Sequence, residues 1–420
     1  MELDSGNTAW VLISTALVLF MTPGLALFYG GMVRSKNVLG MLMQNIFAMG
    51  LLAVLWAALV FSLAFGDAGN AGFIGNFDYV WLKDVGPALT DQEFLSFLTI
   101  PFILFCAYQM TFAIITPALI TGATADRLKF SAYAVFIGVW LVLVYGPLAH
   151  MVFGGGWLAD LGALDFAGGA VVHMNAGAAA LALIILLGRR KGYPDTPMPP
   201  HNLPMTVLGT GILWFGWAGF NAGSALAADG VAAQAIMNTF LAAAAAMLGW
   251  LVVERIKGGH ATTLGGASGA VAGLVAITPC AGFVGGMAPV YIGLFTGAAC
   301  YLALGLKKAL KFDDSLDVIA VHLVGGLIGS LLLGLFADSN INPGVLALDP
   351  AAPVDGLFLG GGTSLLLDQI VASVVTLAFS FVASLVIGKV IDLTIGLRVT
   401  EEDEDLGLDL SQHAEVAYAD

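Results

Sequence analysis

The sequence predicts an all-α, polytopic membrane protein with eleven transmembrane helices. Of its 420 residues, 59% are hydrophobic and only 10% are charged, whereas soluble domains carry about 25% charged residues. The apolar residues gather in runs of about 17–25 residues, the length that an α-helix needs to cross a bilayer. The 54 glycines suit close packing between such helices.

The eleven predicted spans follow one another along the whole chain. The N-terminal segment is acidic and lacks the positive region of a secretory signal peptide, so the first apolar run is expected to stay as a span. The eighth run is the shortest and is rich in glycine. The spans cover residues 9–32, 41–65, 94–122, 132–152, 166–187, 203–226, 231–253, 263–279, 289–306, 318–336 and 365–390.

The basic residues predict the orientation of the chain. Fourteen of the fifteen Lys and Arg residues follow odd-numbered spans, and only Lys83 lies on the other side. The positive-inside rule therefore places the N-terminus outside and the C-terminal tail in the cytoplasm. The loop between spans two and three is acidic, which fits either ordinary solvation or a vestibule that collects cations. Its acids are Asp67, Asp78, Asp84, Asp91 and Glu93.

Two matched segments indicate an internal repeat. His173 lies in span five within VVHMNAG, and His322 lies in span ten within AVHLVGG. Each histidine follows an aspartate by eight residues, Asp165 and Asp314 respectively. Spans that are five apart run in opposite directions, so the pattern predicts two inverted five-helix halves, about 9–188 and 203–337, and one extra helix. Inverted repeats place substrate sites near the midplane, between the halves.

A histidine inside a membrane span is costly and indicates function. Two of them suggest one shared site in which the imidazoles share a proton, and burial favours their neutral forms. Such a pair suits a small neutral polar molecule or a proton relay; a metal site and purely structural hydrogen bonding are the alternatives. Asp165 lies roughly 12 Å from His173 along a helix. It is therefore expected to cap the start of span five, to attract a cation, or both.

Aromatic residues accompany polar ones in spans three and six. Tyr108 and Phe112 are four residues apart and share one helix face. The string LWFGWAGFNAGSA contains Trp217, Phe220 and Ser224. Aromatic faces attract cations such as ammonium, although aromatics facing lipid are the simpler interpretation. No set of nucleophile, base and orienting group recurs and no phosphate loop occurs, so an enzyme, a cofactor, a metal centre and a nucleic-acid partner are not expected.

At these residues the sequence resembles the ammonium transporter (Amt/Mep/Rh) family, in its prokaryotic Amt branch. The matching stretches run from span one to the tail. They are TPGLALFYGGMVRSKNVL, YQMTFAIITPALITGATADRLKF, HMVFGGGWLADLGALDFAGGAVVHMNAG, WFGWAGFNAGSA, DDSLDVIAVHLVGG and GLRVTEEDEDLGLDLSQHAEVAY. The resemblance implies a homotrimer in which each subunit has its own pore, eleven helices and a 5+5 inverted repeat.

The resemblance also assigns roles to individual residues. His173 and His322 resemble the twin pore histidines of the family, and Phe112 and Phe220 resemble the stacked gate above them. Ser224 resembles part of the outer recruitment site, Asp165 resembles the acid near that site, and Trp217 resembles a pore-lining residue. Tyr108, on the same helix face as Phe112, is a further candidate for the pore. Phe153 stands where the family pattern has a tryptophan. A phenyl ring still attracts a cation, but tryptophan is the stronger partner.

The C-terminal tail, residues 399–420, follows the transmembrane domain of residues 1–398. Its five consecutive acids, 401–405, favour a flexible and solvated segment by charge alone. The resemblance instead implies a folded cytoplasmic element that contacts a neighbouring subunit and a P-II (GlnK-type) regulatory protein.

The resulting hypothesis is nitrogen uptake across the plasma membrane. Ammonium is stripped of water near Phe112, Phe153 and Ser224, its proton is removed or relayed, and NH₃ passes the twin histidines. K⁺ cannot become neutral by losing a proton, so an apolar pore excludes it. An ammonium sensor with the same fold and a Rhesus-like neutral gas channel are the alternatives.

Overall fold

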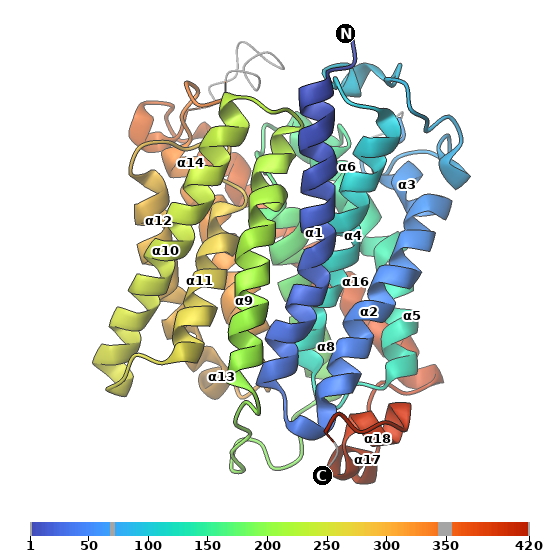
Figure 1. Cartoon of the computed structure of the whole chain (residues 1–420), viewed down its shortest axis with the longest axis vertical. Helices are drawn as coiled ribbons and strands as arrows, with labels where there is room; N and C mark the ends of the chain where they lie inside the picture. Colours follow the sequence, from blue (N-terminus) through green and yellow to red (C-terminus); the bar gives the residue numbers. More distant parts are fainter. Residues whose placement is uncertain (1, 68–71, 343–354, 419–420) are drawn as a thin grey trace.

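The structure is a computed structural model that describes residues 2–67, 72–342 and 355–418. Within these residues the chain is helical, and its only β-structure is one isolated antiparallel bridge between Leu128 and Arg398. Figure 1 shows most helices running side by side along the long axis of the molecule. The N-terminus lies at its upper end, which we call the head end, and the C-terminal helices lie at its lower end, the tail end.

Ten helical stretches in the described part of the chain are long and apolar enough to cross a membrane. They are Ser5–Met32 (α1), Ser35–Phe65 (η1 Ser35–Asn37, α2 Val38–Leu55, η2 Trp56–Val60, α3 Phe61–Phe65), Phe102–Thr124 (α4), Phe130–Asp160 (α5 Phe130–Trp140, η5 Leu141–Tyr145, α6 Gly146–Phe153, α7 Trp157–Asp160), Gly169–Leu187 (η6 Gly169–Met174, α8 Asn175–Leu187), Leu203–Ala225 (α9 Leu203–Trp217, η7 Ala218–Ala222, η8 Gly223–Ala225), Gly230–Gly258 (α10), Ala288–Leu310 (α12 Ala288–Ala303, α13 Gly305–Leu310), Ile319–Phe336 (η9 Ile319–Val324, α14 Gly325–Phe336) and Ser364–Thr394 (α16).

The eighth predicted span corresponds to α11 (Thr263–Ile277), which is apolar but has only 15 residues. The all-α prediction is confirmed, and the eleven predicted spans correspond to ten full-length stretches and this short helix. The predicted third span starts eight residues too early, because Pro101 precedes the first residue of α4 in an extended conformation. A proline also disfavours helical geometry in the residue before it, so residues 94–101 do not continue the helix.

Glycines let the helices of the second half approach one another closely. A Cβ atom added at Gly249 of α10 would lie 2.4 Å from the carbonyl oxygen of Leu294 on α12. At Gly293 and Gly297 of α12 an added Cβ would lie 2.4 and 2.0 Å from carbonyl oxygens of α10. Side chains are therefore excluded at these positions, which explains part of the high glycine content through backbone packing between spans.

Several spans contain a π-helical turn, in which the backbone accommodates one extra residue. These turns are η2, η5, η6, η7 and η9. π-Helical turns are rare and concentrate at functional sites. Here η6 carries His173, η9 carries His322 and η7 carries Phe220, so three of the residues singled out by the sequence lie on such turns.

The C-terminal tail is folded. It forms α17 (Glu401–Leu406) and α18 (Leu408–His413). Helix α17 starts with a capping box, in which the Thr400 side chain accepts from the Asp403 N–H and the Asp403 side chain accepts from the Thr400 N–H. This arrangement satisfies free donors at the start of a helix.

The tail packs against loops at the tail end of the bundle. The Lys36 ammonium donates to the Glu404 carbonyl oxygen at 2.9 Å, and the Leu408 N–H donates to the Asn37 side chain at 2.8 Å. The Glu404 carboxylate is buried, where it accepts from the Lys191 N–H and from the Arg398 guanidinium. The interpretation of the acidic run as a flexible segment is therefore wrong, because basic residues from distant loops balance its charge.

Candidate functional site

The two intramembrane histidines meet in the structure. Their Nδ1 atoms are 3.3 Å apart, and their rings are 5.3 Å apart with a 28° angle between the planes. Both side chains are buried, with 1% and 2% of the residue exposed for His173 and His322. Segments 149 positions apart in the sequence therefore form one site.

Each histidine lies on a π-helical turn whose first N–H groups are bound by the preceding aspartate. Asp165 accepts from four consecutive backbone N–H groups, those of residues 168–171, at 2.6–3.2 Å. Asp314 accepts from the N–H groups of Val318 and Ile319 at 3.1 and 2.8 Å. These bonds match the capping interpretation for Asp165 and identify Asp314, rather than Asp317, as its counterpart.

Glycine is needed where the first of these turns begins. Gly168 has a φ of 113° and precedes the first residue of η6, a conformation that residues with a Cβ atom rarely adopt. An added Cβ at Gly169 would lie 2.6 Å from the ring of Pro279. The string FAGGAVVH thus supplies both the unusual backbone conformation and the close approach that place His173.

An aromatic column leads to the histidines. The rings of Phe112 and Phe220 are 4.4 Å apart between centroids with a 47° angle between planes, and Tyr108 contacts Phe112 edge to face at 5.0 Å. Trp217 and Phe220 lie 5.5 and 6.0 Å from the His173 ring. Spans three, five and six therefore contribute to one continuous stack of rings.

The polar groups of this column have partners within the protein. The Tyr108 hydroxyl lies 2.8 Å from the Gly219 carbonyl oxygen and 3.2 Å from the Ser224 hydroxyl. The Ser224 hydroxyl lies 2.9 Å from the Phe220 carbonyl oxygen, and the Trp217 indole donates to the Thr278 hydroxyl at 2.9 Å. These bonds fix the orientation of the rings, and they leave Ser224 at the wall of a cavity.

Two cavities lie on either side of the Phe112–Phe220 pair. The outer cavity, of about 370 Å³, is lined by Phe112, Phe153, Ser224, Asp165 and Gln109, among others. The inner cavity, of about 10 Å³, is lined by Phe220, Trp217, His173 and His322 together with aliphatic side chains. A space of this size holds about one water-sized molecule. The two phenyl rings thus separate a roomy aromatic cavity from a narrow apolar one.

The structure brings all nine predicted residues into this one region. It also adds residues to which sequence analysis gave no role. Gln109 lines the outer cavity, and its place one residue after Tyr108 was the available signal. Thr278 orients Trp217 from a different span, for which the sequence offered no signal. In the described ranges, no cluster of three or more His, Cys, Asp or Glu side chains could hold a metal ion.

Comparison with known proteins agrees with the fold. A model of the Ammonium Transporter Family matches residues 9–418. An ammonium transporter of Mycobacterium tuberculosis is 51% identical over 99% of this chain and 90% of its own length. An ammonium transporter of Bacillus subtilis is 48% identical over the full length of both chains.

Solved structures give the same result. The crystal structure of Saccharomyces cerevisiae Mep2 superposes with a TM-score of 0.87 and 36% identity, covering 96% of this chain and 89% of that chain. A structure titled Sensor Amt Protein superposes with a TM-score of 0.87 and 30% identity, covering 97% and 98%.

These matches define the class of the protein as a multi-pass membrane transporter and not an enzyme. Within that class, the chain belongs to the ammonium transporter family. Its members are plasma-membrane proteins, in agreement with the ten long apolar helices among the described residues.

Proposed function

We propose that this protein carries ammonium-derived nitrogen into the cell. Ammonium binds in the outer cavity, loses a proton, and crosses as NH₃ through the inner cavity past His173 and His322. The observation that carries this proposal is the 3.3 Å contact between two buried imidazoles beside an apolar space of about 10 Å³.

Recruitment of the cation is assigned to the outer cavity. Phe112 and Phe153 offer ring faces to a cation, and the Ser224 hydroxyl offers an oxygen at the same wall. The Asp165 oxygens are occupied by backbone N–H groups, so Asp165 acts by its negative charge and by holding η6. Tyr108 holds Ser224 and the gate in place.

Selectivity follows from desolvation. A bare cation loses its hydration in an apolar cavity that offers few compensating groups, at a cost of several kcal/mol. Ammonium avoids this cost by leaving its proton behind, and K⁺ has no equivalent route. The contact between Phe112 and Phe220 lies between the two cavities. The inner space of about 10 Å³ has room for about one water-sized molecule and not for a hydrated ion.

The twin histidines provide the polar surface that a neutral molecule needs. One shared proton between the Nδ1 atoms leaves one Nε2 as an acceptor and the other as a donor. In the described part of the chain, the buried Nε2 of His173 has no hydrogen-bond partner. It is therefore available to an NH₃ molecule or to a proton that is passed along.

The test is ammonium-evoked current and internal pH in vesicles that contain the purified protein. We compare the wild type, the variant with His173→Ala and His322→Ala, and the control His260→Ala at an exposed position. Loss of the current, or of its selectivity over K⁺, in the double variant alone supports the proposal. If the wild type gives no current but the pH inside the vesicles rises, the protein is a neutral NH₃ channel. If neither signal appears, the transport proposal is wrong.

A sensor is the second candidate. The likeness to a structure titled Sensor Amt Protein is the observation that favours it, and the folded tail would then transmit the signal. In the experiment above, ammonium binding without current or pH change would favour this function.

We also propose the arrangement of the chain in the membrane and its assembly. The halves 9–188 and 203–337 form an inverted repeat with 365–390 as the extra helix, the head end faces outward, and the tail, 399–420, is a cytoplasmic regulatory element after the transmembrane domain, 1–398. The matched Asp–His segments and the one-sided basic residues support this arrangement. Labelling of a cysteine in place of exposed Lys83 by an impermeant thiol reagent on intact cells tests the orientation; protection of that cysteine would contradict it.

Three copies of the chain are proposed to form a homotrimer that binds a P-II protein at its tail end. Exposed apolar side chains such as Phe215 and Leu248 fit contact with lipid or with another copy. Native mass spectrometry tests the trimer, and the mass of a single subunit would contradict it. Co-purification with a P-II protein, and its loss on deletion of residues 399–420, tests the second partner.

A further inference from the structure

One guanidinium joins the tail ends of three helical segments that carry the proposed pore residues. Arg127 follows α4, the helix of Tyr108 and Phe112, and its side chain is fully buried. Its Nη1 donates to the carbonyl oxygens of Ala123 and Ala125 at 3.3 and 3.2 Å. These bonds attach the guanidinium to the end of its own helix.

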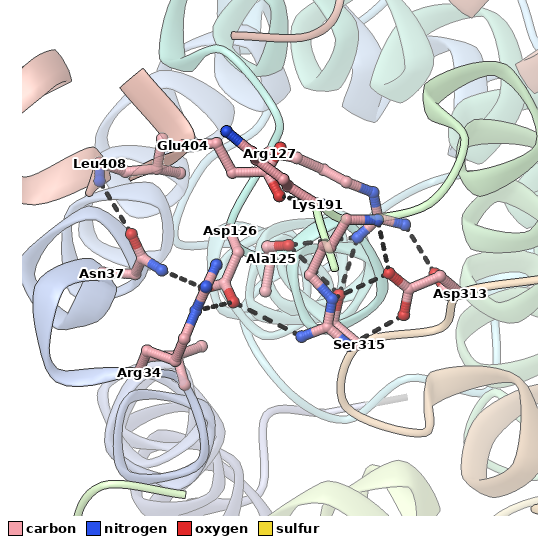
Figure 2. Close-up of polar contacts among 12 residues, drawn as sticks. Arg34, Asn37, Ala125, Asp126, Arg127, Lys191, Asp313, Ser315, Glu404 and Leu408 are labelled. Atoms are coloured by element: carbon pink, nitrogen blue, oxygen red, sulfur yellow. Dashed lines mark hydrogen bonds and ion pairs between the residues drawn. The ribbon is translucent and has the colours of Figure 1, made fainter. Parts of the chain in front are cut away.

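The same guanidinium contacts both histidine-bearing segments. Its Nε donates at 3.0 Å to the carbonyl oxygen of Gly188, which directly follows α8 and so terminates the His173 segment. Its Nη2 donates at 2.6 Å to the Asp313 carbonyl oxygen and its Nη1 at 2.8 Å to the Ser315 hydroxyl, just before η9. Figure 2 shows Arg127 with Ala125, Asp313 and Ser315 around it.

We propose that Arg127 is a positioning residue for the twin histidines. It fixes the segment of His173 against the segment of His322, so that the two Nδ1 atoms meet inside the helix bundle. This inference rests on the proposed function, in which the histidines line the path of NH₃.

The link from Arg127 to His322 is short. The carbonyl of Asp313 accepts from Arg127, and the next residue, Asp314, binds the first N–H groups of η9. A shift of Asp313 therefore moves Asp314 and the π-helical turn that carries His322. On the other segment, α8 is one continuous helix from the end of η6 to Leu187. A shift of Gly188 therefore moves α8 as a whole, together with η6 and His173.

The chemistry requires arginine at this position. The acceptors around Arg127 are neutral oxygens in several directions, which suit a planar group with five N–H donors. Carbonyls at helix C-termini also carry partial negative charge. Burial lowers the pKa of Arg127 to about 10, with the charge of Asp313 acting in the opposite direction, so the guanidinium stays protonated at neutral pH. Lysine offers one compact ammonium and cannot reach these acceptors together.

Because the neighbouring Arg190 binds the Asp313 carboxylate, Arg127 can donate to backbone carbonyl oxygens. The carboxylate of Asp313 is bound by Arg190, with Nη2–Oδ1 and Nε–Oδ2 distances of 2.8 and 2.9 Å. Asp126 in turn accepts from Arg34 at 3.0 Å (Figure 2). It also lies 3.5 Å from Arg190. The charges of the cluster are therefore balanced mainly by the other arginines, and Arg127 acts on helix ends.

The experiment compares Arg127→Lys with Arg255→Lys, a matched change at an exposed tail-end arginine. Ammonium transport is measured per folded protein over a range of concentrations, and the structure of each variant is determined. For Arg127→Lys we expect a maximal rate reduced about tenfold, a half-saturating concentration within about twofold of wild type, and Nδ1 atoms separated by at least about 0.5 Å more. Arg255→Lys should match the wild type in all three.

The inference is wrong if Arg127→Lys keeps both the wild-type maximal rate and the wild-type distance between the two Nδ1 atoms. It is also wrong if the variant gives less protein but the rate and this distance are unchanged. If Arg127→Lys does not fold, Ser315→Ala removes one acceptor of Arg127 together with the bond that the hydroxyl donates to the Ala123 or Ala125 carbonyl oxygen. It should lower the maximal rate about twofold, and an unchanged rate overturns the inference. The His173→Ala and His322→Ala variant is assayed in parallel. If it transports normally, the proposed function is wrong, whereas the histidine separation still decides the role of Arg127.

Discussion

The segments 165–187 and 314–336 follow the same local rule in two different surroundings. In each, an aspartate binds the first N–H groups of a π-helical turn, and a histidine eight residues later lies within that turn. Asp165 binds four N–H groups and borders the aromatic outer cavity. Asp314 binds two and lies near the ion pair of Lys307 and Asp317.

The comparison indicates that the two matched Asp–His segments build the candidate site, whereas their different surroundings make its two ends unlike. At the head end, Asp165 lines a cavity of about 370 Å³, the one proposed above to bind the cation. At the tail end, Asp314 follows Asp313, whose carboxylate Arg190 binds, and it lies near the ion pair of Lys307 and Asp317. Burial raises the pKa of both carboxyls; for Asp314 the charge of Asp317 adds to this effect, Lys307 and the two N–H groups oppose it, and the pKa is about 6.

The largest expected effect comes from removing each aspartate. Asp165→Ala leaves four N–H groups at a buried turn without their acceptor, and each such group costs about 1–3 kcal/mol. We expect transport to fall at least about 100-fold, whereas Asp314→Ala, with two N–H groups affected, should lower it about tenfold. Initial uptake rates, normalised to folded protein by gel filtration, measure both values.

Asn variants at both positions are the controls, because an amide oxygen still accepts N–H bonds. They should transport better than the Ala variants. The comparison is wrong if Asp314→Ala lowers transport more than Asp165→Ala does. The number of capped N–H groups would then not decide the stability of the turns.

A smaller effect is expected in the outer cavity alone. Phe153→Trp provides a stronger cation–π partner, worth about 0.5–1 kcal/mol. The half-saturating ammonium concentration should fall about two- to fivefold with the maximal rate unchanged, because the inner cavity is untouched. A concentration series in the vesicle assay measures both, and Phe153→Leu should change the half-saturating concentration in the opposite direction. A change in maximal rate alone would exclude Phe153 from recruitment.

The smallest effect concerns stability and pH. The pKa of Asp314 is about 6 in the folded protein and about 3.9 in an unfolded chain. The folded state therefore binds the proton more tightly, and the stability from this group is complete below about pH 4 and lost as the pH rises through about 6. From pH 5 to 7, the thermal midpoint of the wild type should fall by about 2 °C relative to Asp314→Asn.

The thermal midpoints of both proteins are measured in one detergent over this pH range, with Asp195→Asn, at an exposed tail-end position, as the control. A constant difference between the wild type and Asp314→Asn would show that Asp314 does not titrate in this window.

The sequence predicted much of the site, because its signals are local. Apolar runs have to satisfy their backbone inside the membrane and so form helices, and the Asp–His spacing repeats in both halves. The sequence did not predict the π-helical turns. The turn that carries His173 begins at Gly169, which packs closely against Pro279, a residue 110 positions later in the chain. The predicted start of span three at residue 94 ignored Pro101, a signal that was present in the sequence.

By itself, the sequence determined that the chain is a helical membrane protein, which segments carry polar residues inside the membrane, and which family it resembles. Only the tertiary structure decided that the Nδ1 atoms of His173 and His322 lie 3.3 Å apart, that Thr278 orients Trp217, and that Arg127 joins three helix ends. The physical reason is that helix formation depends on residues a few positions apart, whereas these contacts join residues 61 to 188 positions apart and depend on how whole helices pack.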